Sequence, residues 1–488
     1  MNQIRQFSII FLVLFIAQWN YVSAQKNILK QISALINQPS VETPLTYLSS
    51  DEMRGRDTGS KEAEIAAQYL ASEFLKLGVK PVANTEGYFQ SFNIERTDGL
   101  GNARLQLSDK ILNFQDDFVL LGGTTGHWSG EFIFAGYGTS EDLQIDLKNK
   151  WVITIAGLPE SSGRAGTYQD SMEKLQRVKS SGGVGLIEFV PAGIAWSSVQ
   201  NLFSKSSAFR IESDLNAFPH VWLKNTNNEL KDWLVSQVNK QIDVSISRTS
   251  PVLLNTSNVV GVLEGTDPKL KHQYIAISAH YDHLGVGPPI DGDSIYNGAR
   301  DNAIGVVTML SAARFFSQYR PKRSILFLGF TAEECGLLGS KWYGSHPLIP
   351  MNQVVFNFNC DGAGYTDTSF VTIIGIDKSS AGSVIRKACT SAGLQAGTEP
   401  VFEKLVFAGT DAFYFINQGI PAVTICPGFH KFDAELFKYY HHPADEVSTL
   451  DYNYLMKYFH ASLLSVYNVV NAKKSPSWLV SSADYTSK

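Results

Sequence analysis

Short apolar runs recur through the second half of the chain, and segments with helical spacing separate them. The runs that predict strands cover 259–263, 274–278, 324–330, 353–359, 370–376 and 421–426. Between them, Val306, Met309, Ala313 and Phe316 share one face of a predicted helix, and a long helix closes the series at 455–470. Strands that are apolar on both faces and alternate with helices predict an α/β fold, with a sheet that helices cover on both sides.

The first half of the chain has a different pattern. An amphipathic helix is predicted at 60–77 and a strand at 88–94. From about Gly99 to Arg248, short predicted strands at 130–140, 150–156, 184–190 and 217–223 accompany helices at 172–180 and 228–238, and His127 and His220 stand alone. We therefore expect an inserted domain at 99–253 within a main domain built from 25–98 and 254–472, with a tail at 473–488.

The N-terminus has the features of a secretory signal peptide. Arg5 precedes an apolar run from Ile9 to Ala17, and Val22-Ser23-Ala24 fits cleavage after Ala24. A short membrane anchor is the alternative, but the run is well below the roughly 20 residues that a spanning helix needs. The sequence thus predicts a signal peptide at 1–24 and an exported product, periplasmic or secreted, with no membrane attachment after cleavage.

Composition adds limits rather than a function. The 488 residues are 44% hydrophobic and 18% charged, which describes a folded chain large enough for more than one structural unit. A net charge of -5 offers no electrostatic case for nucleic acid or for an anionic membrane. Four cysteines, Cys335, Cys360, Cys389 and Cys426, lack a metal-type spacing, so buried thiols are expected and a bridge between Cys335 and Cys360 stays open.

Reactive side chains gather where the predicted strands end. The strand at 324–330 is followed by Glu333 and Glu334, an arrangement that either forms a solvated loop or places two acids at the ligand-binding edge of an α/β sheet. Other strand ends, helix starts and loops deliver His280, Asp301, Asp361 and His441. Imidazoles and carboxylates without cysteine suit zinc or a similar divalent ion. So many carboxylates would repel one another, and two divalent ions are the simplest way to offset their charge.

Together these residues resemble the dizinc exopeptidase family of bacterial leucyl-type aminopeptidases. The matching motifs are His280-Tyr281-Asp282, Gly298-Ala299-Arg300-Asp301-Asn302, Glu333-Glu334, Asp361 and Tyr440-His441. The resemblance covers the second half of the chain and 47–77, and 99–253 resembles a protease-associated domain. It implies the zinc exopeptidase fold, with a mixed, mostly parallel sheet and a smaller β-rich insert. It also implies a zinc-dependent aminopeptidase that holds two Zn²⁺ or similar ions per chain and acts on peptides.

The resemblance also implies a role for each matching residue. Asp301 would bridge the two ions, with His280 and Asp361 completing one ligand set and Glu334 and His441 the other. Glu333 would be the general base, which suits a carboxylate that is charged at neutral pH. Asp282 would hold His280 by its free ring nitrogen, Asp445 would do the same for His441, and Tyr440 would donate to the oxyanion.

Several alternatives remain open from the sequence. His442 competes with His441 as ligand, whereas His283, His430 and His460 are expected to be bystanders. Thr410-Asp411-Ala412 stands where the family often has Ser-Asp-His, which leaves the substrate role of that histidine without a counterpart. Carboxypeptidase or dipeptidase activity on the same fold is the main competing function. Glutaminyl cyclase, with one zinc and no counterpart of His280, and a non-catalytic receptor-like protein are further alternatives.

Overall fold

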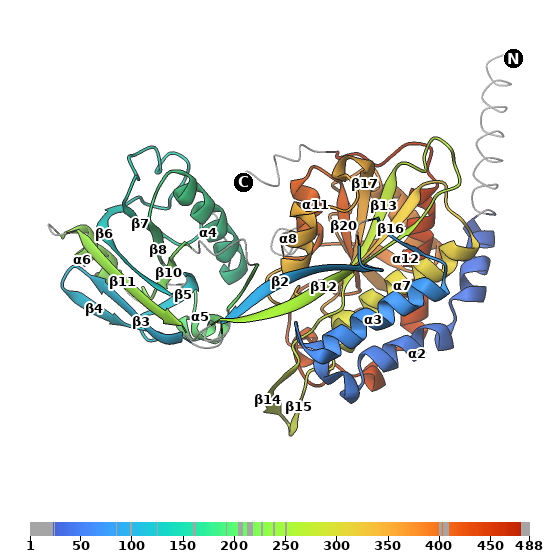
Figure 1. Cartoon of the computed structure of the whole chain (residues 1–488), viewed down its shortest axis with the longest axis horizontal. Coiled ribbons are helices and arrows are strands. Elements are labelled where there is room, and N and C mark those ends of the chain that lie inside the picture. The colour runs from blue at the N-terminus through green and yellow to red at the C-terminus, as the bar shows by residue number, and fades with distance from the viewer. Residues whose placement is uncertain are drawn as a thin grey trace, which may run out of the picture. The chain divides into compact units, whose positions relative to one another are not determined.

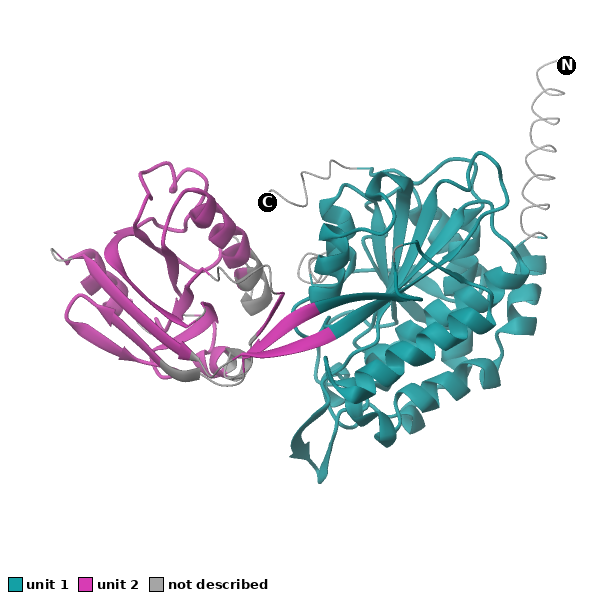
Figure 2. Cartoon of the chain, viewed as in Figure 1, with its two compact units in different colours: residues 1–92, 256–488 teal, residues 93–255 magenta. Residues whose placement is uncertain are grey.

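The chain forms two compact units, which the computed structural model shows in different colours in Figure 2. Unit 1 joins Met1–Phe92 to Thr256–Lys488, and unit 2 is Asn93–Asn255. The structure describes residues 23, 25–83, 85–97, 100–123, 125–159, 163–191, 193–203, 208–211, 218–225, 228–237, 240–248, 251–399, 403 and 409–479. Almost all of the predicted signal peptide and the end of the predicted tail lie outside these ranges. Among the helices they contain, none has both the length and the apolar character needed to cross a membrane.

Unit 1 is built on a mixed sheet whose central strands are parallel. Its strand order is β19-β18-β20-β17-β13-β16-β12-β2, with β1 paired to β12. The strands are β1 (Lys80–Pro81), β2 (Phe89–Thr97), β12 (Val252–Leu263), β13 (Tyr274–His280), β16 (Ser324–Phe330), β17 (Val354–Cys360), β18 (Phe370–Ile374), β19 (Gln395–Gly397) and β20 (Ala422–Pro427). β20, β17, β13 and β16 run parallel to one another. β12 is antiparallel to β16, and β18 is antiparallel to β20 but parallel to β19. The predicted α/β class is confirmed.

Helices cover both faces of this sheet (Figure 1). They are α2 (Gln38–Leu48), α3 (Lys61–Lys76), α7 (Ile304–Gln318), α8 (Leu338–Ser345), α9 (Gly382–Ser391), α11 (Ala412–Asn417) and α12 (Tyr452–Val470). Alternate residues of each strand serve opposite faces: Phe327 packs in the core that contains α2, α3, α7, α9 and α12, whereas Leu326 packs in the core that contains α8 and α11. This alternation explains why the strands read as continuous apolar runs.

The remaining elements of unit 1 are short. They are the turns η1 (Asp51–Arg56), η3 (Ala299–Ala303), η4 (Met351–Gln353), η5 (Leu436–Lys438) and η6 (Val447–Thr449), and the hairpin β14 (Val286–Ile290) and β15 (Asp293–Ile295). The predicted helix at 60–77 is present as α3, with the Ser60 side chain accepting a hydrogen bond from the Ala63 amide as its N-cap.

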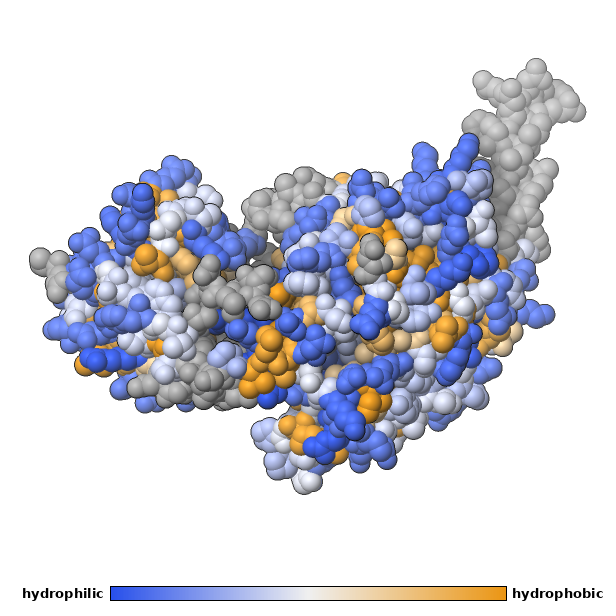
Figure 3. Space-filling model, in the orientation of Figure 1, coloured by the Kyte–Doolittle hydropathy of each residue, from blue (hydrophilic) through white to orange (hydrophobic). Residues whose placement is uncertain are grey.

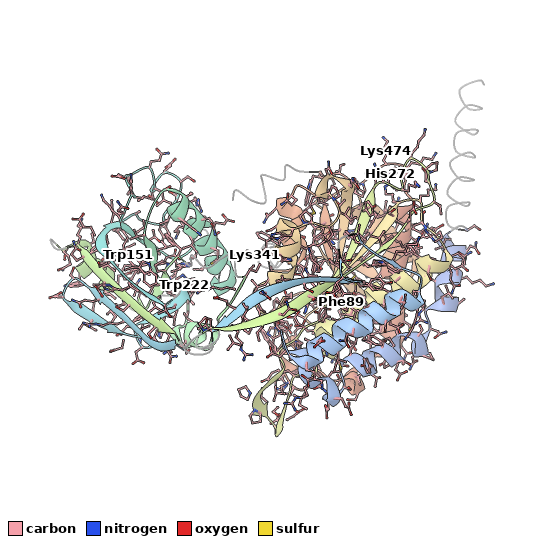
Figure 4. All side chains as sticks on the ribbon, in the orientation of Figure 1. Phe89, Trp151, Trp222, His272, Lys341 and Lys474 are labelled. Atoms are coloured by element: carbon pink, nitrogen blue, oxygen red, sulfur yellow. The ribbon has the colours of Figure 1, made fainter. Side chains whose placement is uncertain are left out.

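Unit 2 holds an eight-stranded sheet in the order β4-β3-β11-β6-β7-β8-β10-β5. Its elements are β3 (Leu100–Leu107), β4 (Lys110–Asn113), β5 (Phe118–Gly122), β6 (Gly126–Phe134), β7 (Trp151–Ile155), α4 (Gly163–Ser180), β8 (Gly185–Phe189), α5 (Trp196–Phe203), β9 (Ala208–Ile211), β10 (His220–Leu223), α6 (Glu229–Val235) and β11 (Gln241–Arg248). β9 pairs with the end of β2 instead. Trp151 and Trp222, labelled in Figure 4, are fully buried in this unit.

Over both units, the face seen in Figure 3 is largely hydrophilic, with hydrophobic side chains in small groups.

A buried ion pair ties α4 to the sheet of unit 2. The Lys174 ammonium donates to the Glu188 carboxylate at 2.7 Å, and His220 Nε2 lies 2.7 Å from the other carboxylate oxygen. All three side chains are completely buried. Burial alone would raise the pKa of Glu188, but Lys174 and His220 outweigh it and lower this pKa to about 2. His220 therefore has a structural partner, as expected for a core histidine.

We expect Glu188→Gln to destabilise unit 2 by about 3 to 5 kcal/mol, because Lys174 would stay buried without a counter-charge. Urea unfolding monitored by tryptophan fluorescence measures this, with Glu131→Gln, an exposed residue of β6, as the control. Because the folded pKa lies below the ordinary 4.5, the stability from this pair is present above about pH 4.5 and is lost as pH falls toward 2. Equal unfolding midpoints for both variants would contradict the prediction.

Candidate metal centre and substrate pocket

The parallel strands at the centre of unit 1 deliver the candidate site residues to one edge of the sheet. β13 ends at His280, while Glu333 and Glu334 follow β16, and Asp361 follows β17 directly. Because these three strands are adjacent and parallel, their carboxyl ends meet at the same edge. Asp301 comes to this edge from η3 at the start of α7, and His441 comes from the loop after η5.

One group of side chains forms around His280, whose ring is 1% exposed. His280 Nε2 lies 3.3 Å from Asp301 Oδ1 and 3.3 Å from Asp361 Oδ1. Each of the three residues can present a ligand atom to a common point, since these atoms all lie within 4.8 Å of one another. This cluster matches the first of the two ligand sets that the resemblance implies.

A second group forms around Glu334. His441 Nε2 lies 3.2 Å from Glu334 Oε2 and 3.3 Å from Asp301 Oδ2. His283 Nδ1 lies 2.7 Å from the other oxygen of Glu334, and its ring packs edge-on against His441 with centroids 5.9 Å apart. His283, Asp301 and Glu334 also qualify as a possible metal-binding group. His442 has its ring nitrogen Nδ1 engaged by the Ala444 amide.

The carboxylate of Asp301 belongs to both groups, because its two oxygens face different histidines. Donor atoms held at about 2.0 to 2.1 Å around a tetrahedral ion lie about 3.3 Å apart, the spacing found at both oxygens. The donor set is oxygen and imidazole nitrogen without thiolate, which suits zinc and similar divalent ions. The residues present therefore fit a divalent metal, and Asp301 offers one oxygen to each cluster.

The adjacent acids Glu333 and Glu334 have opposite electrostatic surroundings. Burial raises the pKa of Glu333 well above its usual range, and the charge of Asp361 adds to this effect while His280 opposes it. Burial acts on Glu334 in the same direction, but His441 and His283 outweigh it and hold its pKa well below the usual range. Neighbouring carboxyls whose pKa values move apart are suited to different tasks, one to proton transfer and one to permanent charge.

Two further carboxylates, those of Asp282 and Asp445, orient the site. His280 Nδ1 lies 3.1 Å from the main-chain carbonyl of Asp282 and 3.7 Å from its carboxylate. The Asp282 carboxylate accepts a hydrogen bond from the backbone amide of Glu333 at 3.2 Å, so it also fixes the backbone at Glu333.

Asp445 does not hold His441, which corrects the expectation from the sequence. Its carboxylate accepts the backbone amides of Arg300 and Asp301 at 2.9 to 3.1 Å and pairs with the Arg300 guanidinium at 3.1 Å. Asp445 thus fixes the turn that carries Asp301. Arg300 is 3% exposed and also packs over Tyr439, with 3.9 Å from its guanidinium carbon to the ring centroid.

A pocket opens beside the first cluster. Its lining comprises His280, Asp301, Glu333, Asp361, Gly362, Ala363, Ile374, Gly409, Thr410, Thr424, Cys426, Phe429, Phe432, Tyr440 and His441. The acids and histidines form one side, and small and apolar side chains form the rest. The Tyr440 ring stacks on His441 with centroids 4.0 Å apart. No lysine or arginine lines the pocket among the residues that the structure describes.

Two residues near the site were not predicted as functional. His283 contacts Glu334 directly, and a Cβ on Gly298 would lie 2.6 Å from its ring, so the glycine leaves room for it. Asp411 is fully buried behind Thr410, and burial raises its pKa to about 7 although His280 opposes the shift. In the sequence, the signal for His283 was its place as the second histidine of His280-Tyr281-Asp282-His283. The signal for Asp411 was the Thr410-Asp411 pair.

Comparison with known proteins agrees with this geometry. Residues 258–466 match the model of peptidase family M28. The chain is 27% identical over 348 residues to aminopeptidase YwaD of Bacillus subtilis, covering 70% of this chain and 67% of that protein. It is 37% identical over 107 residues to a probable leucine aminopeptidase 2 of Aspergillus oryzae, covering 22% of this chain and 19% of that protein.

A solved structure supports the same fold. The aminopeptidase from Aneurinibacillus sp. strain AM-1 has a TM-score of 0.58 at 20% identity, covering 91% of this chain and 97% of that one. The predicted resemblance to the zinc exopeptidases and the predicted fold are therefore confirmed.

Proposed function

We propose that this chain, whose residues 258–466 match the model of peptidase family M28, is an exported aminopeptidase that uses two divalent metal ions, most simply zinc. The observation that carries the proposal is the Asp301 carboxylate, whose two oxygens lie 3.3 Å from His280 and from His441 respectively. The matching relatives named as aminopeptidases support the reaction class. Export rests on the sequence of residues 1–24 alone.

The proposed mechanism assigns the metals to Asp301, His280, Asp361, Glu334 and His441. When bound there, two divalent ions would polarise the scissile carbonyl and lower the pKa of a water from about 15.7 to about 7. The Glu333 carboxylate takes the proton of the attacking water and returns it to the leaving amine. Its side chain lies 4.0 Å from His280 Nε2, beside the first cluster.

Other side chains orient these groups. Asp282 accepts the Glu333 amide, and Asp445 holds the backbone of Asp301. The Tyr440 phenol lies against His441 and is proposed to donate to the oxyanion of the tetrahedral intermediate. Unit 2, which we propose is the protease-associated-like insert, contributes none of these residues.

The charge of the pocket favours an amino-terminal over a carboxy-terminal exopeptidase. No lysine or arginine is among its described lining residues. A terminal carboxylate would need a free arginine or lysine. Among the described residues, Arg56 and Arg300 contact the loops of the site, and both are buried and engaged by protein acceptors.

Metal reconstitution tests the proposal. Protein stripped by a chelator is expected to be inactive on leucine p-nitroanilide, and zinc titration should restore activity with two ions bound per chain, as counted by mass spectrometry. Full activity with one ion bound would overturn the two-metal assignment. Activity that survives chelation would exclude metal hydrolysis.

A further inference from the structure

A short segment far from the family match lies directly against the candidate metal centre. Residues Gly55–Thr58 end η1 and precede α3, some 200 residues before the matched segment begins. The His283 amide donates to the Arg56 carbonyl at 3.2 Å, and the Gly285 amide donates to the Gly55 carbonyl at 3.0 Å. The segment therefore pairs through its backbone with the loop that follows His280.

The side chain of Arg56 adds a second set of contacts, all to main-chain carbonyls. Its guanidinium donates to Tyr281 at 2.9 Å, to Asn297 at 2.8 Å, to Gly298 at 3.1 Å and also to Leu48. Tyr281 directly follows His280, and Gly298 lies three residues before Asp301. One guanidinium thus joins the loop that carries one proposed ligand to the loop that carries the bridging ligand.

Arginine suits this position for two reasons. Its planar group presents five donors in fixed directions, so it can serve several carbonyls at once, which the ammonium of lysine cannot do with the same geometry. Burial lowers its pKa to about 10, opposed by the charges of Asp282 and Asp445, so it stays protonated at neutral pH. The side chain is 1% exposed and keeps a positive charge beneath a site rich in carboxylates.

Thr58 makes a separate contact to the same site. Its hydroxyl donates to Asp282 Oδ2 at 2.8 Å, and Asp282 Oδ1 accepts the Glu333 amide at 3.2 Å. Thr58 is 1% exposed. The Thr58 hydroxyl therefore holds the Asp282 carboxylate in place. That carboxylate in turn holds the backbone of Glu333, the proposed general base.

We propose that Arg56 and Thr58 are positioning residues of the metal centre. Arg56 sets the separation of the loops that carry His280 and Asp301, and Thr58 acts through Asp282 on Glu333. The inference rests on the proposed metallopeptidase function. It extends the functional unit to a segment that lies outside the family match, and it predicts effects on metal affinity and turnover beyond any effect on folding.

The test compares Arg56→Lys and Thr58→Val with two matched controls. Arg54→Lys changes an exposed arginine of η1, and Thr308→Val removes a buried hydroxyl that donates to the Ile304 carbonyl within α7. Thr58→Ser, which keeps the hydroxyl, serves as the rescue variant. Each full-length protein is measured for zinc affinity by chelator competition, for kcat and KM on leucine p-nitroanilide, and for its thermal midpoint in chelator.

Loss of an outer-shell partner typically weakens metal affinity by roughly 10- to 100-fold, and we expect that loss for Arg56→Lys. Thr58→Val should lower kcat by about 10-fold or more at similar KM, because the contact acts on the proposed base, and Thr58→Ser should restore it. Both controls should match the wild type in zinc affinity and kcat.

Unchanged zinc affinity and kcat in both variants, with only a lower thermal midpoint in chelator, would overturn the inference and leave a purely structural role. Should Arg56→Lys fail to fold, the Thr58 pair still decides the outcome. A wild-type protein that binds no zinc would instead refute the proposed function itself, so the two failures are distinguishable.

Discussion

Replacing Glu333 with glutamine is expected to lower kcat by about 100- to 10,000-fold, the usual contribution of a general base. The substitution keeps the size of the side chain and removes its ability to take a proton. Metal content should not change, because Glu333 is outside both proposed ligand sets and the Asp282 contact uses its backbone amide. Steady-state kinetics on leucine p-nitroanilide, with metal analysis of the same sample, measure both quantities.

The control for this variant is Glu141→Gln, which alters an exposed glutamate of unit 2 and should leave kcat unchanged. Retained zinc with a kcat close to that of the wild type would remove Glu333 as the base. Loss of zinc together with activity would instead place Glu333 among the ligands, because its side chain also lies within 4.0 Å of His280.

Asp301→Asn is expected to have the largest effect on metal binding, since one carboxylate serves both clusters. The amide lacks the negative charge and offers only one oxygen, so neither ion would keep its full set of donors. We expect affinity at both positions to fall by more than the roughly 10- to 100-fold that loss of an outer-shell partner costs, and activity to be lost. Competition with a chromophoric chelator measures both affinities.

Asp361→Asn provides the matched comparison, because Asp361 contacts only the His280 cluster. Asp361→Asn should lower the affinity for one ion and leave the affinity for the other unchanged. Asp291→Asn, on the exposed β14–β15 turn, should change neither affinity. If Asp301→Asn weakens one ion only, Asp301 does not bridge, and the two-metal arrangement would need a different shared ligand.

The sheet and the strand-end acids could be predicted because both leave a local signal. Apolar residues on both faces of β16 and β17 produce continuous runs, and the runs stop where the chain turns at the sheet edge. Asp361 follows the end of β17 directly and Glu333 follows β16 after two residues, so their placement at one edge follows from adjacent parallel strands. The strands of unit 2 were harder, because β3, β4 and β11 pair antiparallel with one another and interleave polar with apolar residues, so they show no such run.

Contacts made through the backbone could not be predicted. Arg56 binds carbonyls, which every residue possesses, so nothing in the sequence marks Tyr281 or Gly298 as its acceptors. We expected Asp445 to hold His441 as Asp282 would hold His280. The folded loop instead turns its carboxylate to the amides of Arg300 and Asp301, whose unpaired donors at the start of α7 attract an acid.

His283 shows the limit of reading single residues. As a third polar residue after His280 it had no role that its position required, and only the folded distance of 2.7 Å to Glu334 indicates its contact.

The choice between an aminopeptidase and a carboxypeptidase had the same difficulty, because it depends on where the arginines lie. In the structure, Arg300 is buried and paired with Asp445, and Arg56 is buried and donates to main-chain carbonyls.

The central claim is most directly tested by one panel of peptides with free, N-acetylated or C-amidated ends, each incubated with zinc or with chelator and followed by mass spectrometry. We expect release of the N-terminal residue from free and C-amidated peptides in zinc, no cleavage of N-acetylated peptides, and no cleavage of any peptide in chelator. Release of C-terminal residues from N-acetylated peptides would contradict the aminopeptidase assignment.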